Sequence, residues 1–386
     1  MERQPSKPNV NSEGVLNPSG VIRQIASLQS TDSRHYAPGL FPSKRFHLHF
    51  PFEREDNNIF FTASIVFILQ NLKPKLSEEE RKIIEVICKK ATANYPDYRN
   101  KDGLDTYNFW RTDGSAHFPN GRFLSKVRKV RIPDDADDTS LIYLTSDQGR
   151  DKGEWLKEKL AKHANLGTKQ ITNTFPGYKD LKAYSTFFGK NMFIEFDVCV
   201  LCNILYFVFE NKLPLNEHDR DSIFFIRSVI ENRQYLDKPF YASHSYPSAP
   251  VILYHVARLL EKFEVPGLSD LTPQLIQDLK MLLEKEEDEM NRVILTTSLM
   301  RLGLTPARTE TVRSGGPGPS PKERGAETLQ AGDGRWSFFH AGLLTAFENP
   351  VAYRLAGNSL FHLKYKCEAH RLTLLLENKI YQNCFL

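Results

Sequence analysis

The stretch DVCVLCNILYFVFEN, residues 197–211, is apolar on almost every side of the helix that its length and composition predict. A helix of this kind is covered by other elements all round, whereas a surface helix keeps one polar face. Five further segments have the same character, so the sequence predicts a set of buried helices. They are residues 59–72, 139–146, 249–260, 291–303 and 368–381.

Between these segments lie helices with a single apolar stripe. SEEERKIIEVICKKA, residues 77–91, is the clearest, and residues 154–163, 217–231 and 272–286 follow the same pattern. Apolar and amphipathic helices therefore roughly alternate, as they would in a double ring whose outer helices cover inner ones. We predict an all-α protein with one main domain folded as an α/α toroid. An irregular helical bundle is the alternative.

Two polar stretches suggest how the chain is organised. Residues 1–34 are rich in Ser, Asn and Pro, which predicts a disordered tail. Residues 305–335 contain many Gly and Pro and no apolar periodicity, so we expect a flexible insertion there. The toroid domain would then span residues 35–304, with helices in residues 336–386 completing it.

Composition bounds the class of protein. A chain of 386 residues with 40% hydrophobic and 25% charged residues has the composition of an ordinary globular protein. Its net charge of +4 favours no nucleic acid partner, and its five scattered cysteines suggest a reducing compartment. No apolar stretch is long enough for a transmembrane segment, and no signal peptide is apparent. We therefore expect a cytoplasmic protein, with peripheral membrane contact left open.

Several apolar helices begin with a polar cluster. These clusters are EDNN (55–58), DDADD (134–138), IEFD (194–197) and SYPS (245–248). Inner helices of a toroid run in the same direction, so these starts would meet at one mouth, where helix N-termini favour carboxylates. We expect either an acidic site above an apolar cavity or, as the simpler alternative, aspartates that only cap helices.

The segment DADDT, residues 135–139, is similar to the Asp-x-Asp-Asp-Thr motif of class II terpenoid cyclases. The resemblance covers the motif and its immediate neighbours. It implies an α/α toroid in which the middle aspartate, Asp137, protonates an alkene or epoxide of an isoprenoid, with Asp135 and Asp138 as its catalytic neighbours. The polyene would then cyclise through carbocations, and no cofactor would be required.

This chemistry suits the residue types nearby. Crowded carboxyls make one of them hold its proton, and aromatic faces stabilise cations. In the metal-site alternative described next, the basic residues just before the motif could hold a diphosphate. The candidate substrate-binding residues are Phe61, Tyr107, Trp110, Lys126, Arg128, Tyr143, Phe196, Asp197 and Tyr254.

A metal site is an alternative. Asp197, Cys199 and His255 are similar in order and residue type to the Asp-x-Cys…His zinc site of protein prenyltransferase β subunits, another α/α-toroid family. Asp, Cys and His are a reasonable ligand set for catalytic zinc with one position left open. This resemblance implies a zinc-dependent prenyltransferase-like protein, with zinc or magnesium as a possible cofactor.

Two further classes stay open. In a toroidal glycosidase or lyase, Asp137 would face Glu195 or Asp197 across a groove, with the aromatic loop 106–121 as its wall. A non-catalytic helical binding scaffold would use its acids only as caps. An open polar cleft would favour a sugar, and a closed aromatic cavity would favour an isoprenoid.

Overall fold

The computed structural model describes residues 17–32, 35–113, 132–189, 192–304, 336–345 and 348–384. These residues form fourteen α-helices and one four-stranded sheet, so the predicted helical class is confirmed, although the sequence analysis does not predict the sheet. The elements are α1 (Pro18–Leu28), β1 (Ser43–Phe46), β2 (Glu53–Asp56), α2 (Phe60–Leu72), α3 (Glu78–Thr92), α4 (Ala136–Thr145), α5 (Arg150–Lys162), α6 (Val198–Glu210), α7 (Glu217–Glu231), α8 (Gln234–Asp237), α9 (Pro239–Ala242), α10 (Ala249–Lys262), α11 (Thr272–Lys285), α12 (Glu289–Arg301), β3 (Phe339–Gly342), α13 (Pro350–Ala356), β4 (His362–Lys366) and α14 (Glu368–Cys384).

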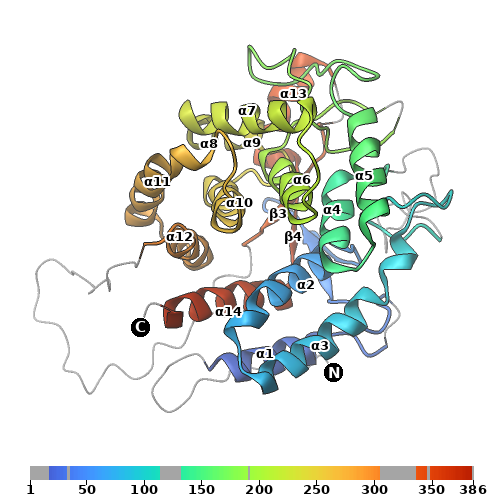
Figure 1. Ribbon diagram of the computed structural model, residues 1–386, viewed down its shortest axis with the longest axis vertical. Helices are drawn as coiled ribbons and strands as arrows, with labels where there is room; N and C mark the ends of the chain where they lie inside the picture. The colour runs from blue at the N-terminus through green and yellow to red at the C-terminus, as the bar shows by residue number, and fades with distance from the viewer. Residues whose placement is uncertain are drawn as a thin grey trace, which may run out of the picture.

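Six helices, which we call the core helices, correspond to the six apolar segments of the sequence. In the order α2, α4, α6, α10, α12 and α14, each contacts the next, and α14 contacts α2 (Figure 1). Every residue of α4 except Leu144 is buried, as expected for a helix covered on all sides. Among the described helices, none is long and apolar enough to cross a lipid bilayer.

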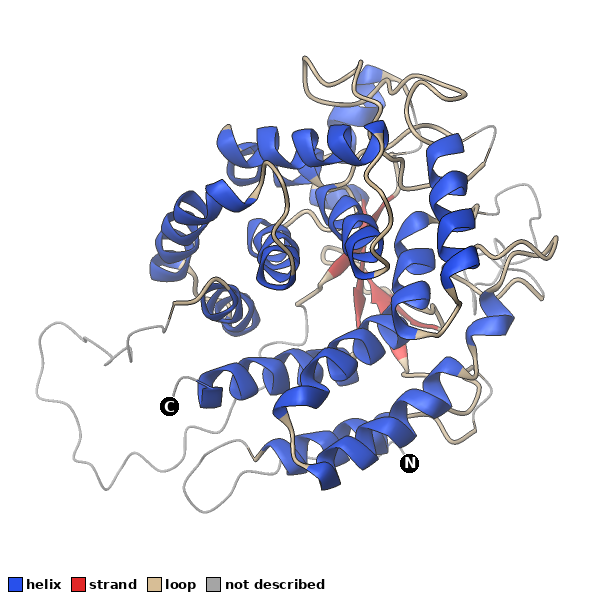
Figure 2. Cartoon of the chain, in the orientation of Figure 1, coloured by secondary structure: helices blue, strands red, loops and turns tan. Residues whose placement is uncertain are grey.

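The amphipathic helices lie outside the core helices. Figure 2 shows α3, α5, α7 and α11 around the periphery, and α11 contacts both α10 and α12. Capping boxes fix where two of them begin: Ser77 and Glu80 bond reciprocally at α3, and Asn216 and Asp219 do so at α7. The predicted alternation of buried and half-buried helices is therefore confirmed.

The predicted disorder of residues 1–34 is wrong for helix α1. The Asn17 side chain caps this helix by accepting a bond of 3.1 Å from the Ser19 N–H. Val21, Ile22 and Ile25 form its buried stripe, through which α1 packs on α3 and α14. Residues 1–16 and 33–34, and the predicted insertion 305–335, lie outside the described residues.

The sheet connects distant parts of the chain to the core helices. Its strands are antiparallel in the order β2-β1-β4-β3. Phe338, the residue before β3, packs against His255 of α10 and His370 of α14, with ring centroids 5.5 and 4.8 Å apart. The segment that leads into β3 therefore presents an aromatic side chain to the interior of the six core helices.

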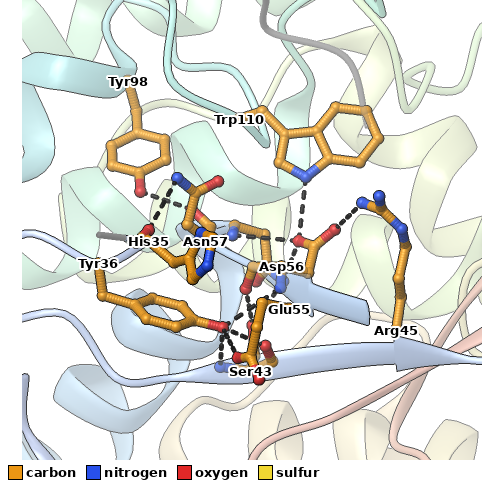
Figure 3. Close-up of polar contacts among 10 residues, drawn as sticks. His35, Tyr36, Ser43, Arg45, Glu55, Asp56, Asn57, Tyr98 and Trp110 are labelled. Carbon is orange, nitrogen blue, oxygen red and sulfur yellow. Dashed lines mark hydrogen bonds and ion pairs between the residues drawn. The ribbon is translucent and has the colours of Figure 1, made fainter. Parts of the chain in front are cut away.

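A buried ion pair anchors the β1–β2 hairpin. Arg45 Nη1 lies 2.5 Å from Asp56 Oδ2, and the two side chains are 2% and 0% exposed (Figure 3). Trp110 Nε1 and Asn58 Nδ2 donate to Asp56 Oδ1 at 3.0 and 2.9 Å. These bonds compensate the cost of removing the carboxylate from water. They tie the hairpin to the loop that carries Trp110.

Replacing Arg45 by Met should lower the free energy of unfolding by about 3–5 kcal/mol, because Asp56 then stays buried without its cation. Urea unfolding followed by circular dichroism measures this. Its neighbour Lys44 bonds Glu53 at the surface, so Lys44→Met should cost less than about 1 kcal/mol. Equal losses in the two variants would contradict the role given to the buried pair.

Candidate functional site

Asp137 lies in the first turn of α4 and is 5% exposed. Its Oδ1 atom accepts a hydrogen bond of 2.5 Å from Asn203 Nδ2, in the middle of α6. Its Oδ2 atom bonds the Tyr246 hydroxyl, which comes from the loop before α10. The carboxyl therefore lies between core helices, with a neutral hydrogen-bonding group at each oxygen.

The surroundings of Asp137 act on its proton in two opposite ways. Burial raises the pKa of Asp137, because the charged form loses its water. The hydrogen bonds from Tyr246 and Asn203 and the charge of Arg258 lower the pKa of Asp137, because they favour the carboxylate. A carboxyl in such a place holds a proton, yet has stabilising groups ready for the anion that remains after transfer.

The two flanking aspartates have different roles. Asp135 is the N-cap of α4, and its Oδ1 accepts a bond of 2.8 Å from the Asp138 N–H. Burial raises the pKa of Asp135 to about 8. Burial, with the charges of Asp135 and Asp137, raises the pKa of Asp138 well above its usual value. Capping therefore accounts for Asp135, but the side-chain bonds of Asp137 reach α6 and the Tyr246 loop.

The candidate metal ligands are engaged separately. Asp197 caps α6 by accepting from the Cys199 N–H at 2.9 Å, and it accepts from Ser243 Oγ at 2.6 Å and the Ser245 N–H at 2.9 Å. His255 Nδ1 lies 2.8 Å from a carbonyl oxygen of its own helix. Burial raises the pKa of the Cys199 thiol well above its usual value. Within the described ranges, no three His, Cys, Asp or Glu side chains could hold a metal ion together.

Only some of the predicted aromatic residues reach the interior of the core helices. Phe61 of α2 packs on His370 of α14 at 5.3 Å between ring centroids. The Tyr254 hydroxyl donates to Glu377 Oε2 of α14 at 2.7 Å. Both side chains are buried among core helices. Tyr254 contacts the ring of Phe338, and the His370 ring that Phe61 contacts also packs on Phe338.

The other predicted contact residues lie elsewhere. Trp110 bonds Asp56 of the hairpin, and Phe196 packs on Phe225 of the outer helix α7 at 5.2 Å. Tyr143 lines a surface pocket of about 260 Å³, and Tyr107 pairs through its backbone with Asp135. None of these four contacts involves Asp137. The predicted basic residues Lys126 and Arg128 lie outside the described residues.

Sequence analysis missed the residues that complete the surroundings of Asp137. Asn203 and Arg258 are isolated polar residues inside α6 and α10, which are otherwise almost wholly apolar. Tyr246 belongs to one of the polar clusters that precede a core helix. A polar residue in the middle of a helix that is apolar all round was the available signal, because such a residue needs a buried partner.

Burial also bears on the glycosidase alternative. Glu195 is 4% exposed, and burial, with the charge of Asp197, raises its pKa to about 8. Its Oε2 atom lies 3.6 Å from His244 Nδ1. Burial lowers the pKa of His244 to about 3, so this imidazole is neutral. Asp137, Glu195 and Asp197 are all buried, which does not match two carboxyls facing an open polar groove.

The raised pKa of Glu195 gives a test of this burial. The unfolded carboxyl has a pKa of 4.5 and the folded one about 8, so the folded state binds more protons between these values. Stability contributed by Glu195 is therefore lost as pH rises from about 4.5 to about 8.

We expect the Glu195→Gln variant to lose less stability than the wild type between pH 5 and pH 8, by on the order of 3 kcal/mol. Urea unfolding across this pH range measures the difference. The exposed Glu217, replaced by Gln, is the matched control and should leave the slope unchanged. Parallel slopes for the wild type and Glu195→Gln would show that Glu195 is not protonated in the folded protein.

Comparisons of the chain with protein-family models, with curated proteins and with solved structures found no match. The similarity to class II terpenoid cyclases therefore depends on the segment 135–139. What the site does has to follow from the chemistry of its own residues.

Proposed function

We propose that the protein is a class II terpenoid-cyclase-like enzyme, in which Asp137 starts the cyclisation of an isoprenoid by protonating it. One observation carries the proposal: the Asp137 carboxyl is buried between Asn203 and Tyr246. Burial favours the protonated acid, and the two donors favour the anion that follows. Protonation of a carbon–carbon double bond needs both properties.

The fold is part of this proposal. We propose that the six core helices and the amphipathic helices outside them form an α/α toroid. The closed order of contacts from α2 through α14 and back to α2 supports this arrangement. Asp137 then lies at the start of an inner helix, where the motif of class II cyclases would require it.

In the proposed reaction, the Asp137 O–H bond breaks as a C–H bond forms at one end of a substrate double bond. The carbocation at the other carbon is attacked by the next double bond, and each attack closes a ring. The last cation either loses a proton to a base, which gives an isomer of the substrate, or captures water, which then loses a proton to a base and gives the hydrate. The Asn203 and Tyr246 donors stabilise the Asp137 carboxylate meanwhile.

Aromatic side chains around Tyr246 suit a cationic intermediate. The Tyr246 ring lies 5.9 Å from Phe60 and 5.8 Å from Phe338, measured between centroids. Burial lowers the pKa of His255 well below its usual value and that of His370 to about 3, so neither imidazole adds a positive charge. Faces of aromatic rings stabilise cations, and their packing keeps water away.

The direct test is incubation of the purified protein with acyclic isoprenoids, namely squalene, its terminal epoxide and geranylgeranyl diphosphate. Gas chromatography with mass spectrometry, after removal of phosphate where present, detects cyclic isomers or hydrates. We expect cyclic product from at least one substrate, and a loss of about 10²-fold or more in Asp137→Asn. The exposed Asp151, replaced by Asn, is a control that should keep wild-type rates.

Two results would reject the proposal. One is a folded wild-type protein that converts none of the three substrates, which favours a non-catalytic scaffold. The other is cyclisation that persists undiminished in Asp137→Asn, which places the acid elsewhere.

A further inference from the structure

Arg258 is a buried cation without a carboxylate in contact. The side chain is 5% exposed, and within the part of the chain that the structure describes no Asp or Glu oxygen lies within 4.0 Å of it. Nη2 donates its hydrogen bond to Asn203 Oδ1, and Nε has no partner. The guanidinium also lies 4.8 Å from the ring centre of Phe67 and 5.5 Å from that of Tyr254.

Other buried arginines of this chain are paired directly. Arg45 bonds Asp56, and Arg301 bonds Glu261 and Glu377. A buried cation without any anion is costly, because protein dipoles replace only part of its hydration. The carboxyl connected to Arg258 by hydrogen bonds is that of Asp137, reached through one intervening side chain.

That side chain is Asn203, and its amide has a donor end and an acceptor end. The acceptor Oδ1 takes the bond from Arg258, and the donor Nδ2 gives a bond of 2.5 Å to Asp137 Oδ1. A guanidinium can only donate, so it fixes which end of the amide faces it. Arg258 therefore orients Asn203 so that an N–H points at the Asp137 carboxyl.

We infer that Arg258, acting through Asn203, sets the acidity of Asp137. In this role Arg258 is a positioning residue: it orients the Asn203 donor and supplies the positive charge that balances the Asp137 carboxylate. Without it, burial would hold the proton too tightly for transfer. The catalytic meaning of this inference rests on the proposed function, but the acidity of Asp137 can be measured without a substrate.

Other titratable groups near Asp137 come from three sources. Asp135 and Asp138 belong to its own helix, Asp197 and Cys199 to the start of α6, and Tyr246 to the loop before α10; α2, which also packs on α4, carries none. The carboxyl and thiol groups among these are anionic when ionised, so they raise the pKa of Asp137 or leave it unchanged, whereas the Tyr246 hydroxyl lowers that pKa through its hydrogen bond. Among the groups that act on Asp137, Arg258 supplies the positive charge.

The test is an NMR titration of protein labelled with ¹³C at aspartate carboxyls, with the Asp137 signal assigned by its loss in Asp137→Asn. In Arg258→Met we expect its midpoint to rise by about one pH unit or more, because the carboxylate loses a nearby cation. Arg258→Lys should recover part of the shift. Asn203→Leu, which removes the donor and keeps Arg258, should also raise the midpoint.

One signal and one variant serve as controls. The Asp56 carboxyl, which is buried beside Arg45, should not move in Arg258→Met. Arg227 of α7 pairs with Asp270 outside the core helices, so Arg227→Met should leave Asp137 unchanged.

An unmoved Asp137 midpoint in a natively folded Arg258→Met protein would overturn the inference. An equal shift in Arg227→Met would also overturn it, because the effect would then come from net charge. If Arg258→Met does not fold, the Asp137 midpoint is measured in Asn203→Leu and Arg258→Lys instead. An unmoved midpoint in both folded variants would then overturn the inference. A shift seen in a protein that cyclises no isoprenoid would leave the acidity inference standing and reject only the proposed function.

Discussion

The removal of carboxyl groups from water is the constraint on which the interior of this protein depends. Asp56, Asp137 and Asp197, which lie at or just before the starts of core helices, are at most 5% exposed, so each of these acids needs donors from other segments. Asp56 forms an ion pair with Arg45, and Asp197 bonds Ser243. Asp137 bonds Asn203 and Tyr246. The kind of donor differs, and that difference determines what each acid can do.

Position within the helix start separates an acid that caps its own helix from one that bonds other segments. Asp135 and Asp197 occupy N-caps, and one oxygen of each accepts from an N–H group of its own helix. Asp137 is two residues beyond the cap, where its side chain extends toward α6 and α10 instead. One acidic cluster therefore supplies both a cap and a buried carboxyl with neutral donors. Helix capping therefore explains Asp135 but not the side-chain bonds of Asp137.

Local patterns predicted the helices well, because apolar periodicity reports burial directly. The six apolar segments became the core helices, and the amphipathic ones cover them. Sequence missed α1, whose apolar stripe has only three residues in a polar context, and the sheet, whose strands have four or five residues each. Elements this short are decided by the partners that they meet in the fold.

The site was predictable only in part for the same reason. The motif predicts a catalytic role for Asp137, but its hydrogen-bond partners Asn203 and Tyr246 lie 66 and 109 positions further along the chain. The sequence predicts that Trp110 contacts substrate, because its hydrogen-bond partner Asp56 lies 54 positions earlier in the chain and cannot be recognised from the sequence.

Neutron diffraction from crystals grown in deuterated buffer at neutral pD tests the central claim most directly, because it locates the proton of Asp137. The account predicts that Asp137 Oδ2 carries a deuteron and donates it to the Tyr246 oxygen, which becomes a donor to Asp137 only after the transfer, and that the ND₂ group of Asn203 faces Asp137. A carboxylate that carries no deuteron and accepts a hydrogen bond from the Tyr246 O–D group would contradict the claim that burial keeps Asp137 protonated before transfer.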